Sequence, residues 1–148
     1  HYYEIARNLA EIRENHNDTL SPQVAKLMAY GATISDEAYQ EAIDCRRGAV
    51  SYFASFFNDF DAIITPSAPG EAPLFSVGST GNPIFSTIWT LCGLPCLNMP
   101  VLMSKNDMPI GVQLVGGREE DDRLLRMGSW LLETLNAVEA DAAESDET

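Results

Sequence analysis

Few residues of this chain have the types and spacing that covalent chemistry requires. The segment Gly78-Ser79-Thr80-Gly81 places a serine in a glycine-rich turn, where a hydroxyl acts as a nucleophile only if a base stands beside it. The segment lacks the G-x-S-x-G spacing of a nucleophile elbow, and no apolar strand leads into it. The two histidines, His1 and His16, both lie in the first helical region. Ordinary turn chemistry therefore explains Ser79 better than catalysis does.

The other reactive side chains also favour structural roles. Cys92 and Cys96 are four residues apart, but no second Cys or His pair completes a zinc site, so neither a metal nor a cofactor is expected. The adjacent carboxylates of residues 119–122 diverge around a helix. The only lysines, Lys26 and Lys105, follow a helix cap and lie in a polar turn, and neither context supplies the burial that a catalytic lysine needs. No catalytic residue is predicted within this chain.

Composition limits the class of protein. The 148 residues are 45% hydrophobic and include thirteen aromatic residues (two Trp, five Tyr, six Phe), which predicts one packed domain. A formal charge of −13 argues against nucleic acid or anionic membrane as a partner. No apolar run approaches the ~18–20 residues of a membrane span, and no signal peptide is visible. The odd number of cysteines favours the cytoplasm.

The elements that position these residues follow from apolar spacing and from capping residues. Ser21-Pro22 and Ser35 are predicted to begin two helices, the second of which is long and acidic in its first turn. Arg46 interrupts the apolar stripe of that long helix, either as a contact for a substrate anion or as a partly buried side chain paired with a carboxylate. A further amphipathic helix follows residues 118–122. Residues 1–136 are predicted to form one α/β domain, and residues 137–148 an acidic, disordered tail.

Three apolar runs predict strands near 61–66, 96–102 and 110–116. The last two are joined by the polar turn of residues 104–107 and should pair as an antiparallel hairpin. The loop of residues 67–81 is longer than a plain connector. Together these elements predict an α/β fold in which helices cover a partial mixed sheet.

The glycines and prolines of residues 80–117 have a distinctive spacing. Asn82-Pro83 begins a short helix, which is followed by Gly93-Leu94-Pro95, Asn98-Met99-Pro100 and Pro109-Ile110-Gly111-Val112-Gln113-Leu114-Val115-Gly116. This pattern resembles the C-terminal part of amidase signature enzymes, and the resemblance extends from about Arg46 to Glu133. His1 is not a native start, so the chain is expected to be the C-terminal part of a longer enzyme.

The resemblance implies hydrolysis of a small-molecule carboxamide to a carboxylate and ammonia through a serine acyl-enzyme. Enzymes of this family use a serine nucleophile, a second serine in a cis peptide bond and a lysine base. No segment here matches that machinery, so the chain alone is expected to be inactive. By position, the resemblance places Thr80, Pro83, Ile84 and Thr87 on the wall of the acyl pocket. Their spacing puts them on one helix face, and an ordinary buried helix face fits the same spacing.

Two other functions stay open. The resemblance also covers the amidase subunit of a glutamine-dependent tRNA transamidation complex, although the acidic composition disfavours work near tRNA. A non-catalytic binding or assembly module is the alternative outside enzymes. If the chain is part of a longer enzyme, it should expose an unpaired strand edge and an apolar patch bordered by the four pocket residues, and it should self-associate through this surface.

Overall fold

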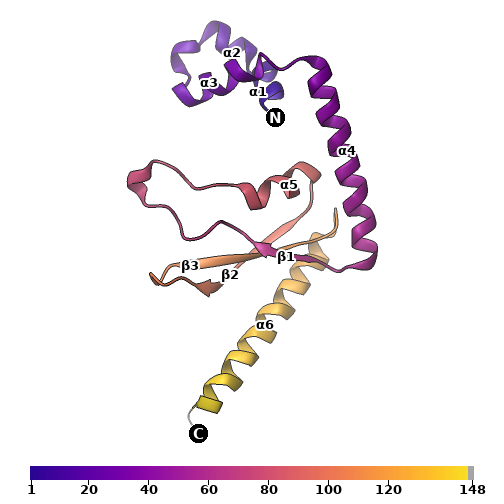
Figure 1. Cartoon of the computed structure of the whole chain (residues 1–148), viewed down its shortest axis with the longest axis vertical. Helices are drawn as coiled ribbons and strands as arrows, with labels where there is room; N and C mark the ends of the chain where they lie inside the picture. The colour runs from indigo at the N-terminus through magenta and orange to yellow at the C-terminus, as the bar shows by residue number, and fades with distance from the viewer. Residues whose placement is uncertain (147–148) are drawn as a thin grey trace. The chain divides into compact units, whose positions relative to one another are not determined.

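A computed structural model describes the backbone of residues 1–146 and their side chains, except those of residue 17 and residues 139–146. Figure 1 shows the arrangement of helices and strands. The chain forms two compact units, of which the first ends at Gly48 and the second begins at Ala49. Helices and a three-stranded sheet confirm the predicted α/β class. Within residues 1–146, none of the helices combines the length and apolar character needed to cross a membrane.

The first unit is helical, and serine side chains begin two of its helices. Ser21 Oγ accepts a hydrogen bond from Val24 N at 3.3 Å, and Ser35 Oγ accepts one from Ala38 N at 3.2 Å, as their sequence positions predict. These caps satisfy N–H groups that have no partner inside the helix. The elements in chain order are α1 (Tyr2–Asn8), α2 (Ala10–Asn15), the short 3-10 helix η1 (Asn17–Thr19), α3 (Pro22–Gly31) and the first half of α4 (Asp36–Asp59).

A stacked tyrosine pair joins α1 to the start of α4. The rings of Tyr3 and Tyr39 are parallel, with centroids 4.0 Å apart, and the Arg7 guanidinium lies 3.5 Å from the centroid of the Tyr3 ring. Tyr3 Oη donates to Asp36 Oδ1 at 2.8 Å, and Arg7 Nη2 donates to the same oxygen at 2.5 Å. The hydrogen bond to Asp36 raises the pKa of Tyr3 above its ordinary value, because the phenol donates to a carboxylate.

The sheet of the second unit has the order β1 (Ile63–Pro66), β3 (Pro109–Val115), β2 (Cys96–Met103). Both neighbouring pairs are antiparallel. The predicted β2–β3 hairpin is confirmed, but the predicted mixed sheet is not what the described strands form. β1 and β2 run in the same direction without being neighbours, because the oppositely directed β3 lies between them. The crevice expected beside a parallel β1 therefore has no basis in this sheet.

The hairpin contains one irregularity, at Pro100. Met99 pairs with Val112 and Leu102 pairs with Ile110, so two residues of β2 oppose one of β3. This count defines a β-bulge. Proline has no N–H to give to the ladder and is tolerated at such a position.

Helix α6 (Asp121–Asp146) packs its apolar stripe on one face of the sheet. Met99, Leu114 and Leu124 form the buried centre of this contact. A Cβ on Gly128 would overlap the Leu97 side chain, so glycine allows α6 to approach β2 closely. α6 continues past Ala137 to Asp146, and no element boundary marks the predicted tail. The predicted disorder of this acidic segment stays a prediction, and residues 147 and 148 lie outside the described residues.

The loop between β1 and the next helix is attached to the hairpin turn. It contains the short 3-10 helix η2 (Phe75–Val77). Asn106 Nδ2 lies 3.0 and 2.9 Å from the two carboxylate oxygens of Glu71. Hydrogen bonds from Asn106 and Ser104 lower the pKa of Glu71, because both stabilise its charged form.

We predict opposite effects for two glycine-to-alanine substitutions in helices of the first unit. A Cβ on Gly31 would overlap the Tyr2 carbonyl oxygen and lie 2.9 Å from Ala6 Cβ, whereas a Cβ on Gly48 meets nothing within 4 Å. Gly31→Ala should destabilise the chain by about 1–3 kcal/mol through overpacking. Gly48→Ala should stabilise it by up to about 1 kcal/mol through helix propensity. Urea unfolding of both variants measures the two effects, and equal effects would contradict the close packing of α1 on α3.

We also predict that the Glu71–Asn106 contact orders the loop. Asn106→Asp should place two carboxylates together and speed amide hydrogen exchange in residues 67–83, and Glu71→Gln in the same chain should restore an amide–carboxylate bond and slow it again. Because the folded pKa of Glu71 is lowered, the contact should be fully present above the ordinary glutamate pKa of about 4.3 and lost as the pH falls through the lowered folded value. Exchange that is unchanged in Asn106→Asp would show that the contact does not order the loop.

Candidate functional site

The candidate site is built on the first turns of α5 (Ile84–Cys92). Asn82 Oδ1 accepts a hydrogen bond from Ile84 N at 3.1 Å, so the predicted Asn82-Pro83 helix start is confirmed one residue later. Pro83 O accepts from Thr87 N at 3.1 Å and from Thr87 Oγ1 at 2.9 Å. Gly93 ends the helix in the left-handed region, with φ 69°, a conformation that glycine adopts without strain. The Gly93-Leu94-Pro95 segment then leads directly into β2.

The four predicted pocket residues lie on exposed surface. Pro83, Ile84 and Thr87 share the first turns of α5, and Thr80 precedes them in the loop; all four are exposed. Ile84 is 61% exposed, so the alternative of an ordinary buried helix face is wrong for this chain. They line neither of the two cavities described next, and their role in binding substrate stays a prediction.

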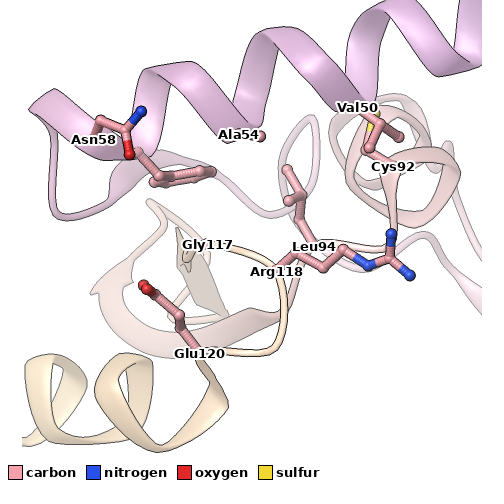
Figure 2. Close-up of a pocket in the computed structure, with 9 residues that line it drawn as sticks. Val50, Ala54, Asn58, Cys92, Leu94, Gly117, Arg118 and Glu120 are labelled. Atoms are coloured by element: carbon pink, nitrogen blue, oxygen red, sulfur yellow. The ribbon is translucent and has the colours of Figure 1, made fainter.

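The first cavity, of about 210 Å³, lies between the C-terminal half of α4 and the segment that leads to α6. Figure 2 shows its lining, with the side chains of Arg118 and Glu120 on the segment that follows β3. Glu120 also accepts a hydrogen bond from Arg123 at 3.1 Å, and Arg123 donates a second hydrogen bond to Asp61. The charged side chains here bind one another, which is a structural arrangement. A second hollow, of about 330 Å³, lies between the end of α4, β1 and α6.

The candidate nucleophiles lack activated surroundings. Ser79 Oγ accepts a hydrogen bond from Gly81 N at 3.2 Å, which is turn chemistry. Lys26 and Lys105 are exposed. Partial desolvation raises the pKa of the Cys96 thiol, which opposes formation of the nucleophilic thiolate. Arg46 is exposed on α4, so the prediction of a partly buried arginine is wrong. Among the residues whose side chains are described, no group of three metal-ligating side chains is present.

Sequence reasoning missed one residue beside the candidate site. Gln113 lies in the centre of β3 and is only 4% exposed. Its Nε2 donates to Pro66 O at 3.1 Å and to Phe85 O at 2.7 Å. The available signal was a single amide side chain inside the apolar run Ile110–Val115, where a polar residue needs hydrogen-bond partners.

Comparisons with known proteins agree with this architecture. The family model described as Amidase matches residues 5–125. The A-type subunit of glutamyl-tRNA(Gln) amidotransferase from Orientia tsutsugamushi strain Boryong is 34% identical over 114 residues, which are 73% of this chain and 23% of the relative. Its counterpart from Helicobacter hepaticus is 35% identical over 108 residues, 68% of this chain and 24% of the relative. The chain therefore spans about a quarter of the length of these curated relatives.

Solved structures share the fold. A crystal structure of an amidase superimposes with a TM-score of 0.80 and 26% identity over 90% of this chain and 33% of that one. The 6-aminohexanoate cyclic dimer hydrolase superimposes with a TM-score of 0.69 at 20% identity, over 90% of this chain and 33% of its own, and this likeness concerns the fold alone. A family model that matches most of the chain and relatives at 34–35% identity lead to one conclusion: the chain belongs to the Amidase family.

Proposed function

We propose that this chain supplies part of the acyl pocket of an enzyme that hydrolyses small carboxamides to carboxylates and ammonia. The observation that carries the proposal is the membership of residues 5–125 in the Amidase family. The described residues lack an activated nucleophile, so the serine acyl-enzyme would form on groups outside this chain. A cytoplasmic location agrees with the three free thiols.

The exposed face of α5 is the part of the chain suited to this role. Pro83, Ile84 and Thr87 present an apolar ring, a branched alkyl group and a methyl group at one helix end. Acyl groups are recognised by apolar walls with few polar atoms. The hydroxyl of Thr87 is bound to Pro83 O, so its methyl group is the part available to a ligand.

A second candidate is the amidase subunit of a glutamine-dependent tRNA transamidation complex. The names of the curated relatives favour it, and it would need glutamine and a second protein as partner. The charge of −13 opposes a direct contact with tRNA. A non-catalytic assembly module is the third candidate, and it is distinguished from both enzymes by the absence of any ammonia release.

We predict that ammonia release from linear carboxamides will distinguish these candidates. The protein carrying the sequence upstream of this chain should hydrolyse simple amides, and the 148-residue chain alone should not. Ile84→Ala should widen the pocket and shift the preference for longer over shorter acyl groups by about tenfold, the effect expected of removed methylenes in a hydrophobic pocket.

Leu125→Ala on α6 is the matched control, because Leu125 is 58% exposed and Ile84 is 61% exposed. An equal change of preference in both variants would contradict the pocket wall. Hydrolysis of glutamine alone, dependent on a second protein, would favour the transamidation complex. Release of no ammonia from any amide or from glutamine would leave the assembly module.

We propose in addition that the chain self-associates through the loop before α5. Leu74, Phe75 and Val77 are 75%, 101% and 64% exposed, and they follow one another around η2. A cluster of apolar side chains so far from any packing partner is typical of an interaction surface. The surface would be covered either by a longer chain of the same protein or by a second copy.

We predict that the 148-residue chain forms dimers or larger species in size-exclusion chromatography with light scattering. Replacing Leu74, Phe75 and Val77 by serine should return it to a monomer, because the apolar area that drives association is removed. Leu125→Ser is the control for loss of one exposed apolar side chain elsewhere. A wild-type chain that is monomeric at all concentrations would contradict self-association.

A further inference from the structure

Gln113 is the only buried polar or charged side chain among the residues that the structure describes. It pairs across the sheet with Thr65 of β1 on one side and Asn98 of β2 on the other. The next residue, Leu114, belongs to the core beneath α6. Because side chains alternate along a strand, Gln113 points to the opposite face of the sheet, the side that carries α5 in Figure 1.

One nitrogen atom of Gln113 holds two separate points of the chain. Its Nε2 donates to the carbonyl of Pro66, the last residue of β1, and to the carbonyl of Phe85, the second residue of α5. These carbonyls stand at the two ends of the loop of residues 67–83. The amide therefore closes this loop at its base, while Glu71 and Asn106 attach it further along.

The first turn of α5 has few other links to the sheet. The hydrogen bonds of Asn82, Pro83 and Thr87 are local to the helix and its cap. Of the hydrogen bonds described, the one from Gln113 is the bond that reaches this turn from a strand. At the far end of α5, Trp89 contacts the Phe53 ring edge-on, with centroids 5.4 Å apart, and Gly93 continues into β2.

We propose that Gln113 is a positioning residue that fixes the first turn of α5 against the sheet and thereby places Pro83, Ile84 and Thr87. This inference rests on the proposed function for the role of those three residues in binding an acyl group. A side chain with two N–H donors on one nitrogen suits the task, because it joins two carbonyl oxygens that would otherwise repel each other. Both acceptors are backbone atoms, so the helix is held whatever side chains it carries.

The two tryptophans of the chain allow a direct test that needs no activity. Trp89 lies in α5 and Trp130 in α6, so Trp130→Phe leaves a reporter on α5 and Trp89→Phe leaves one on α6. In the Trp130→Phe chain, Gln113→Met and Gln113→Glu should each shift the emission of Trp89 to longer wavelength. Methionine removes both donors, and glutamate places an acceptor against two carbonyls. In the Trp89→Phe chain, the emission of Trp130 should not change.

Gln23→Met is the matched control, because Gln23 is an exposed residue of α3. It should leave both reporters unchanged. An unchanged Trp89 emission in Gln113→Met and Gln113→Glu would overturn the inference. A shift of both Trp89 and Trp130 would also overturn it, because it would show a general loosening of the second unit.

Kinetics in the protein that carries the upstream sequence test the consequence for binding. Gln113→Met should raise the KM for a carboxamide by about tenfold with less than about a twofold change in kcat, the pattern expected when binding is lost and the chemical step is not. A variant that was only destabilised would lose active protein and kcat while keeping its KM. That second pattern would overturn the positioning role.

The two proposals fail in different ways. If the wild-type protein hydrolyses amides and Trp89 does not respond to Gln113 substitutions, the inference about Gln113 is wrong and the proposed function stands. If Trp89 responds and the wild-type protein releases no ammonia, Gln113 positions α5 and the proposed function is wrong.

Discussion

The second unit depends on a central strand whose two faces meet opposite environments. Leu114 faces α6 and is almost fully buried in the apolar core with Met99 and Leu124. Gln113, its neighbour in sequence, faces the side of α5 and forms hydrogen bonds with two backbone carbonyls. A shift of β3 by one residue would place the amide in the apolar core and the leucine against the carbonyls. The register of the whole sheet is therefore fixed by this pair of adjacent residues.

The same strand explains why the exposed site residues can stand on exposed ground. A helix turn without a packed outer face needs support from beneath, since it gains little from burial. In this chain the support is polar and comes from the sheet, while the loop before α5 has its own contact between Glu71 and Asn106. The structure can thus leave Phe75 and Ile84 uncovered while the backbone that carries them is held by hydrogen bonds.

Local features of the fold could be predicted from the sequence because local chemistry decides them. Ser21, Ser35 and Asn82 cap helices where their spacing indicates, and a polar turn between apolar runs predicts the hairpin. The glycine and proline spacing was sufficient to indicate the family. The pairing of β1 with β3 could not be predicted, because an apolar run shows burial but not the direction of its neighbour. The role of Gln113 was missed for a related reason, since its partners lie 47 and 28 residues away.

The bulge at Pro100 also affects how a further strand can join this sheet. β2 lies at one edge of the described sheet, and an edge strand offers its outward N–H and C=O groups to any extended segment. At Pro100 the backbone has no N–H to offer, and the extra residue bends the strand there. A continuous ladder along the outside of β2 is therefore limited to the residues before the bulge, Cys96 to Met99. The proline that shapes the hairpin thus also protects this edge against indiscriminate strand addition and fibre-like stacking.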